Sequence, residues 1–229
     1  MNLMLIVASL ISWTVLVNAA PSQYTPSQIE QINSKNMVDS LPYDISPMTY
    51  TGTVNGKEQR FSGTIEVIPS NPTHSFHVPT LKQEVHAKIA KLDPSFHAGL
   101  ENLTLSTRDV SETRDISGPP LCLDRWGFAN VARILQGVAY LRYHGGGCGV
   151  KALKCARISC SYDAAIYLCN DNEFGIAPSC NELSDYPQKI IDRCGWMSSG
   201  DTFHNPTLQV GGQQFSDVKF NIYLGHNNC

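Results

Sequence analysis

No cysteine occurs in the first 121 residues of this 229-residue chain, although eight follow. The sequence also lacks the paired CxxC spacing of zinc sites, the GxSxG and HExxH signatures, a P-loop and a dinucleotide-binding fingerprint. It contains no repeat or low-complexity tract, and its formal net charge is only -3. These absences argue against the common metal, nucleotide and hydrolase classes, and the weak charge argues against a nucleic-acid binder. We predict no metal, no cofactor and no nucleic-acid partner.

One long apolar run lies at the amino terminus. Residues 3–17 are almost entirely apolar, and Val17-Asn18-Ala19 follows with small residues at the two positions that a signal peptidase requires. The run has the length of a signal-peptide core and is too short for a comfortable membrane span. We therefore predict that residues 1–19 are a signal peptide, and that the mature protein is secreted, extracellular and without a stable membrane span.

An even number of cysteines behind a signal peptide predicts disulfides, because the secretory route is oxidising. We expect four bridges and no free thiol. At about 2–4 kcal/mol each, four bridges rival the whole net stability of a small domain. The eight residues are Cys122, Cys148, Cys155, Cys160, Cys169, Cys180, Cys194 and Cys229.

Four of these cysteines fall within the stretch 148–171. The residues from Leu153 to Cys160 alternate with the two-residue period of a strand, and the run 164–169 indicates a second strand after a short turn. A tight antiparallel pair is the simplest outcome. The alternation places Cys155 and Cys160 on opposite faces, so we expect each to join the strand to a different neighbour and not to bond to the other.

The half without cysteines is largely polar. Residues 20–47 are rich in Pro, Ser, Gln and Asn, which predicts a linker or a loosely held arm. Residues 105–118 form a second polar linker. Asn102 carries the one acceptable N-glycosylation sequon, because the other two contain the forbidden proline, and it is exposed if it is used.

Residues 48–104 predict a hairpin followed by a helix. Asn55-Gly56 lies between two runs rich in Thr, Val, Ile and aromatic residues, which is the strongest short hairpin signal. Apolar residues then recur at helical spacing as far as Leu92, after a capping box at Thr80–Gln83. Such a core is small, so we expect it to pack on the second half of the chain. Removal of this region as a pro-region stays an open alternative, although the chain has no dibasic pair.

Residues 119–229 predict a cysteine-rich α/β sandwich domain. A helix capped by Asp124 ends at Gly145–Gly147, and the strand pair, a helix over 184–193 and strands over 207–210 and 215–224 follow. In the last strand, apolar and polar residues alternate, and Val218 belongs to the apolar face. The order α-β-β-α-β-β is typical of an antiparallel sheet with two helices on one face. We thus predict an α+β fold, with a disulfide-stapled antiparallel sheet and two helices, preceded by the hairpin-plus-helix half.

Several segments of the chain resemble one group of proteins. GVAYLR precedes a glycine-rich turn and CARISCSYDAAIYLCND, and a helix ending in Cys, GGQQF and a terminal strand closing on Cys follow. Upstream, YTGTVNG, FSGTIEV and HAKIAKLDPSF belong to the same pattern. Together they resemble small secreted cysteine-rich proteins of filamentous ascomycete fungi, and are similar in character to killer-toxin-like α/β sandwiches. The resemblance implies an effector or toxin-like protein with no catalytic motif. It also makes Cys148 and Cys180 look like an added pair, which we expect to be bonded to each other.

A few side chains are candidates for catalysis. His144 precedes three glycines, where a loop can carry a general base, and a surface turn histidine is the plainer interpretation. The carboxylates of Asp163, Asp171 and Glu173 are candidates for glycoside or phosphodiester cleavage. Turns after strands require the same residue types, so these positions do not by themselves predict an enzyme.

Two pairs of residues suggest binding. His74 and His77 have the HxxH spacing of metal ligands, but an extended segment does not place the two rings together as a helix does. Trp126 and Trp196 flank the stapled domain and are candidates for binding anchors, with core packing as the default alternative.

Three functions stay open. The stapled scaffold and the missing catalytic signature favour an effector or toxin that acts by binding a host or competitor protein or glycan. The alternatives are a small secreted hydrolase or nuclease that uses His144, and a carbohydrate-binding or cell-wall-associated protein. For the binding function we expect contact through the loops Gly145–Gly147 and Asn170–Ala177, because ordered loops lose less entropy on binding.

Overall fold

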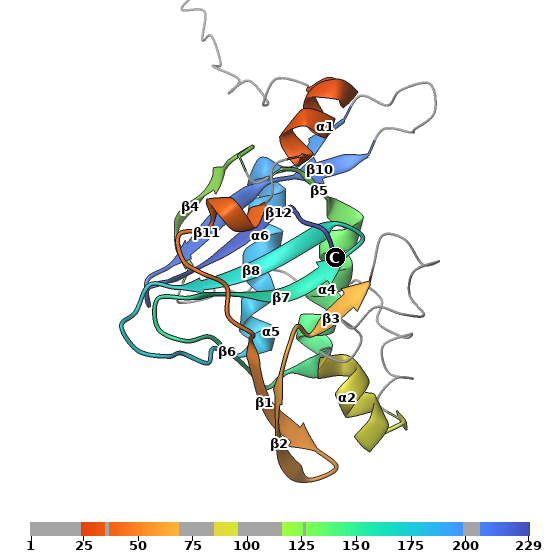
Figure 1. The fold of residues 1–229 in the computed structure, drawn as a ribbon, viewed down its shortest axis with the longest axis vertical. Helices are drawn as coiled ribbons and strands as arrows, with labels where there is room; N and C mark the ends of the chain where they lie inside the picture. Colours follow the sequence, from red (N-terminus) through yellow and green to blue (C-terminus); the bar gives the residue numbers. More distant parts are fainter. Residues whose placement is uncertain (1–23, 35–36, 69–84, 96–115, 126, 199–206) are drawn as a thin grey trace, which may run out of the picture.

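The central element of the fold is a six-stranded sheet with the strand order β3-β7-β8-β12-β11-β4 (Figure 1). The structure is a computed structural model that describes residues 24–34, 37–68, 85–95, 116–125, 127–198 and 207–229. β3 pairs with β7 in parallel, and the other pairings of this sheet are antiparallel. The six strands are β3 (Glu66–Ile68), β4 (Ile116–Cys122), β7 (Cys155–Ser161), β8 (Ala164–Asn170), β11 (Gly212–Ser216) and β12 (Phe220–His226). The mixed α+β class with antiparallel sheets is thereby confirmed.

β7 and β8 form the tight antiparallel pair that the sequence predicts. Tyr162 and Asp163 make the turn between them, and both have positive φ. The register shifts between Arg157 and Ser159, which marks a β-bulge with one extra residue in β7. The bulge returns Cys160 to the face that already holds Cys155. The prediction that these two cysteines face opposite sides is therefore wrong, because alternation alone does not reveal a bulge.

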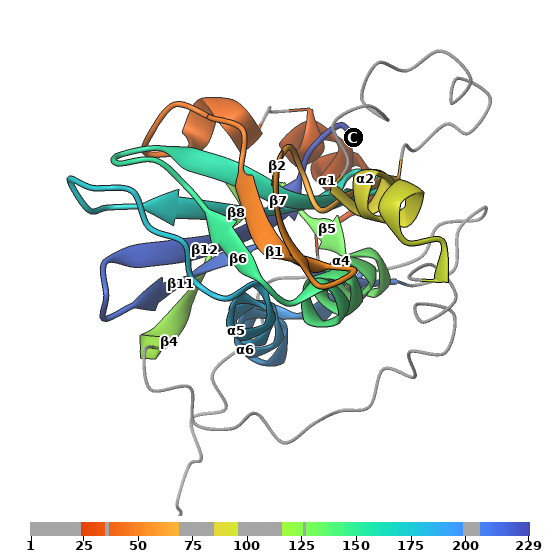
Figure 2. The same ribbon diagram turned by 90° about the horizontal axis from the view of Figure 1, so that it is seen from below.

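Helices cover one face of the sheet (Figure 2). They are α4 (Val131–His144), α5 (Cys180–Leu183) and α6 (Asp185–Cys194). α4 begins later than the expected cap at Asp124, because the side chain of Asn130 accepts a hydrogen bond from the Ala132 N–H and caps the helix there. Gly137 lets α4 approach β7 and β8, since a Cβ at this position clashes with Ser159.

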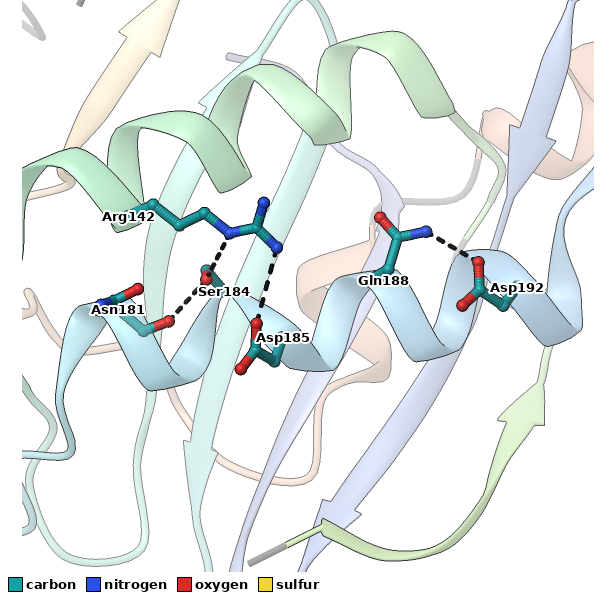
Figure 3. A network of polar contacts seen from close by, with 6 residues as sticks. All are labelled: Arg142, Asn181, Ser184, Asp185, Gln188 and Asp192. Carbon is teal, nitrogen blue, oxygen red and sulfur yellow. Dashed lines mark hydrogen bonds and ion pairs between the residues drawn. The ribbon is translucent and has the colours of Figure 1, made fainter. Parts of the chain in front are cut away.

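A polar network ties α4 to the other two helices (Figure 3). Arg142 Nε donates to Ser184 Oγ at 3.1 Å, and its Nη2 lies 3.6 Å from Asp185 Oδ1. Ser184 Oγ in turn donates to the Asn181 carbonyl at 2.6 Å. The contacts hold the junction of α5 and α6 against the last turn of α4, just before the glycines at 145–147.

The segment before the first strand covers the opposite face of the sheet. A 3-10 helix, η1 (Met37–Ser40), places Met37 fully buried beside Tyr167 and Tyr223. Further on, Ser46 N–H donates to the Cys155 carbonyl at 2.8 Å. We expected a linker or loosely held arm over residues 20–47, whereas the part after Met37 packs as a lid on the sheet.

The hairpin joins a second sheet. β1 (Thr49–Val54) and β2 (Lys57–Ser62) pair around a turn in which Asn55 and Gly56 both have positive φ. β1 also pairs with β6 (Gly147–Gly149) from the cysteine-rich half. The three strands β2-β1-β6 thus link the two halves of the chain through backbone hydrogen bonds.

α2 (Val85–Leu92) lies against the hairpin. Asn55 Nδ2 donates to the Leu92 carbonyl, and Lys88 Nζ donates to the Ser62 carbonyl. Val85 and Ile89 of α2 are fully buried in the same core as the helices of the second half. The capping box expected at Thr80–Gln83 lies outside the described residues.

Shorter elements complete the fold. Asn33, at the end of α1 (Pro26–Asn33), accepts a hydrogen bond from Phe128 N–H at 2.8 Å. A three-stranded sheet is formed by β5 (Ala129–Asn130), β10 (Leu208–Val210) and β9 (Trp196–Met197). The expected single strand over 215–224 is instead the hairpin β11–β12, because Lys219 adopts positive φ and turns the chain. Within the described part of the chain, no helix has the length and apolar character to cross a membrane.

Four disulfides are present and no cysteine is free. All four lie in the cysteine-rich half. Cys155 and Cys160 bond to different partners, as expected, and Cys148 bonds to Cys180, the pair that the resemblance suggested. The pairs are Cys122–Cys194, Cys148–Cys180, Cys155–Cys169 and Cys160–Cys229.

Candidate binding surface

Three loops meet at the end of the sheet where β8 ends, at the left of Figure 1. They are residues 151–154 before β7, residues 171–176 after β8, and residues 217–219 between β11 and β12. The backbones of the loops are bonded directly: Leu153 N–H donates to the Asn172 carbonyl at 3.2 Å, and Asp171 N–H donates to the Lys219 carbonyl at 3.0 Å. The loops therefore form one unit.

Two asparagines fix this unit from inside. Asn170 is fully buried, and its Nδ2 donates to the carbonyls of Lys151 and Phe174 at 3.1 and 2.7 Å. Its Oδ1 accepts from the backbone and side-chain nitrogens of Asn172, both at 2.9 Å. Asn172 Nδ2 reaches the Val218 carbonyl at 3.1 Å. A buried amide with every donor and acceptor engaged holds its neighbours in one arrangement.

Each of the three loops presents an apolar side chain to solvent. Phe174 is 65% exposed, Val218 is 50% exposed and Leu153 is 44% exposed. We name these three residues the apical patch. Single exposed apolar residues are normal on a protein surface, but a large aromatic ring on a fixed loop is typical of a binding anchor. The apical patch is thus a candidate contact surface.

The two loops expected to make contact lie beside each other. Cys180 N–H donates to the Gly146 carbonyl at 2.9 Å, and Val150 and Ile176 exchange two backbone hydrogen bonds. The Cys148–Cys180 bridge joins the same two segments covalently. The structure therefore connects Gly145–Gly147 to the loop that carries Phe174.

A cleft opens next to the apical patch. It has a volume of about 530 Å³ and lies between the segment 38–45 and the loop before β7. At its surface, Lys154 Nζ lies 2.6 Å from Asp44 Oδ2, whose side chain is 87% exposed, and this hydrogen bond and the lysine charge lower the pKa of the Asp44 carboxyl. The lining residues are Val38, Asp39, Leu41, Pro42, Tyr43, Asp44, Ile45, Leu153 and Lys154.

His144 is buried and not a surface turn residue. Its Nδ1 lies 2.7 Å from the Tyr140 carbonyl, which only accepts, so Nδ1 carries the proton. Its Nε2 then accepts from His86 Nδ1 at 3.1 Å. Burial lowers the pKa of His144 to about 4; the hydrogen bond to the Tyr140 carbonyl opposes this shift, and the neighbouring His86 adds a smaller lowering effect. Both ring nitrogens are engaged in the interior, so this geometry suits a structural role better than a general base open to substrate.

The candidate carboxylates do not converge. Asp163 lies in the turn before β8, whereas Asp171 and Glu173 follow its far end. Seven residues of strand separate the two ends by roughly 20 Å. A pair of carboxylates that shares one substrate bond is therefore not formed by Asp163 with either of the other two.

Trp196 packs in the interior. Its ring lies 5.1 Å from that of Phe128 and 5.5 Å from that of Tyr24, centroid to centroid, so the default of core packing holds for it. Trp126, His74, His77 and the sequon at Asn102 lie outside the described residues. Among the residues that the structure does describe, no group of three or more His, Cys, Asp or Glu side chains is placed to hold a metal ion.

Sequence reasoning missed most of the apical patch. Alternation in the sequence predicts Val218 on an apolar strand face, and nothing in the sequence indicates that the Asn170 side chain organises the loops. The run Asn170-Asp171-Asn172 after a strand does signal a turn. It does not reveal that the two amides bond to loops 19 and 46 residues away.

Comparison with protein-family models, with curated proteins and with solved structures finds no match to this chain.

Proposed function

We propose that this protein is a secreted effector or toxin-like protein that binds a protein of a host or competitor through the apical patch. One observation carries the proposal: Phe174 is 65% exposed on a loop whose backbone is held by the buried Asn170. An aromatic side chain buries a large area on binding, and a fixed loop loses little entropy when it does so.

The charges around the apical patch favour a protein partner. A polyanion requires a basic surface, and the three loops instead carry three lysines and three acidic residues. Such mixed polar residues around an apolar centre are the usual surroundings of a protein contact. The charged residues are Lys151, Lys154, Asp171, Glu173, Asp217 and Lys219.

Secretion is supported by two features of the chain. The four disulfides require an oxidising compartment to form and persist. The run over residues 3–17 has the length and flanking residues of a signal peptide. The resemblance to secreted cysteine-rich proteins of ascomycete fungi supports action outside the producing cell, on a plant host or on a competing fungus.

The test compares the oxidised protein with Phe174→Ala in two assays, leaf infiltration scored for cell death and immunity, and growth of competing fungi. Loss of a central aromatic anchor costs about 2 kcal/mol or more, so we expect the active concentration to rise at least about 30-fold. Met197→Ala is the matched control, because Met197 is 51% exposed on β9, away from the three loops. An equal response from wild type and Phe174→Ala, or no response in either assay, contradicts the proposal.

A further inference from the structure

The cleft beside the apical patch is lined by carboxylates, an aromatic ring and apolar side chains. We infer that it binds an arginine side chain of the partner protein. The inference rests on the proposed function, because Leu153 belongs to both the cleft and the apical patch. A partner segment that covers Phe174 passes over Leu153 and reaches the cleft.

The carboxylates in the cleft outnumber its cations. Asp39 and Asp44 line it together with one lysine, Lys154, which is already bonded to Asp44. Within the described ranges, Asp39 makes no hydrogen bond or ion pair, so its carboxylate is available to bind a ligand. Asp171 adds a further negative charge at the edge, where it interacts with Tyr43. The cleft is therefore complementary to a cation.

The walls of the cleft favour arginine over lysine. The Tyr43 ring and the apolar side chains of Val38, Leu41 and Pro42 lie beside the carboxylates. A guanidinium is weakly hydrated, stacks on aromatic rings and bonds a carboxylate through two parallel N–H groups. An ammonium is more strongly hydrated and lacks the planar fork. The apolar walls also accommodate the methylene stem that carries the guanidinium.

The inference is tested without the partner. We would titrate ¹⁵N-labelled oxidised protein with Nα-acetyl-arginine methylamide, and separately with the matched lysine and norleucine compounds. We expect the arginine compound to shift the amide signals of residues 38–45, 153 and 154 and to saturate them in the millimolar range. The lysine compound should bind more weakly, and the norleucine compound should leave these signals unchanged.

Variants assign the effect to the carboxylate. An exposed ion pair contributes about 0.2–1 kcal/mol, so Asp39→Asn should raise the Kd of the arginine compound by up to about fivefold. Asp192→Asn is the control, because Asp192 bonds to Gln188 on the exposed side of α6 (Figure 3). Equal shifts from arginine and norleucine, no shift in the cleft, or binding unchanged by Asp39→Asn overturns the inference.

The two tests separate the two proposals. Loss of the biological response in Phe174→Ala together with a failed titration removes only the arginine site. A successful titration without any biological response removes only the proposed function.

Discussion

The two halves of the chain are stabilised by different interactions. Residues 116–229 contain four disulfides, whereas residues 37–92 contain none and are held by backbone pairing and apolar contact. Three segments of the first half, around Ile45, Ile65 and β3, bond in turn along the outer edge of β7. An uncovered strand edge invites aggregation, so the first half completes the sheet that the disulfides brace.

Two of the four bridges lie beside the candidate contact surface. Cys155–Cys169 joins β7 to β8 directly below the apical loops, and Cys148–Cys180 joins the two segments beside them. The first half contributes the lid and one wall of the cleft, but it contributes no residue to the apical patch. Non-covalent packing therefore closes the core of this protein, while two covalent bonds brace the segments next to the loops that Asn170 and Asn172 hold by hydrogen bonds.

The largest expected effect comes from removing the first half. A fragment that begins at Ile116 loses the cover of β7 and several fully buried side chains, each of which stabilises the fold by about 1.5–3 kcal/mol. For six such side chains the loss is about 9–18 kcal/mol, which is as large as the typical net stability of about 5–15 kcal/mol, so we expect no native fold. The lost side chains include Met37, Met48, Tyr50, Ile65, Val85 and Ile89.

The fragment's ¹H–¹⁵N NMR spectrum provides the measurement. We expect poorly dispersed signals. A dispersed spectrum with the four native bridges contradicts the structural role of the first half and supports its removal as a pro-region.

Removing the Cys148–Cys180 bridge should lower the free energy of unfolding and also reduce the order of the neighbouring loops. The Cys148→Ser/Cys180→Ser variant opens a link between residues 32 apart, which costs about 3–4 kcal/mol by loop-closure entropy. Denaturant unfolding measures this loss. Hydrogen exchange should show that loops 145–147 and 171–176 lose protection first.

The Cys122→Ser/Cys194→Ser variant is the control, since it opens a longer loop elsewhere in the fold. It should lose at least as much stability while the apical loops keep their protection. Equal loss of loop protection in both variants would contradict a local role for Cys148–Cys180.

A smaller effect concerns the contact between the halves at His86 and His144. Burial lowers the pKa of His144 from 6.5 to about 4, so the folded protein binds a proton less readily than the unfolded chain. Stability is therefore complete above pH 6.5 and falls as the pH drops toward 4. The loss amounts to about 3 kcal/mol at most, at 1.36 kcal/mol for each pKa unit.

Urea unfolding of wild type and His144→Gln between pH 7 and pH 4 measures this effect. The variant should be less stable at pH 7 and should show a weaker decline with acid. His226→Gln is the comparison, because burial also lowers the pKa of His226 while Asp163 opposes the shift. A decline of the same slope in His144→Gln and wild type removes His144 as its source.

Local signals in the sequence predict part of this fold. The alternation in β7 and β8 and the turn between them involve neighbouring residues, so the pair could be predicted. The bulge between Arg157 and Ser159 could not, because it occurs where α4, distant in the sequence from this hairpin's turn, packs on the face of β7 through Gly137 and Ser159. Nor does the sequence predict the lid around Met37, because its few apolar residues are dispersed among polar ones.

The candidate site could be predicted less well than the fold. The loop that carries Phe174 was expected to make contact because it follows a cysteine-rich strand. Val218 and Leu153 join it through the side-chain amides of Asn170 and Asn172 and through backbone hydrogen bonds, all between loops that are far apart in the sequence. Likewise, the burial of His144 depends on His86, 58 residues earlier.

We expect the apical loops to be ordered before any partner binds. Backbone ¹⁵N relaxation of the oxidised protein measures this order. We predict order parameters near 0.85 for residues 171–176, equal to those of β8. These order parameters should fall in Asn170→Ala, which removes the hydrogen bond to the Phe174 carbonyl. They should not fall in the control Asn228→Ala, because Asn228 is exposed near the carboxyl terminus. Order parameters below about 0.6 for this loop in the wild-type protein would contradict this expectation.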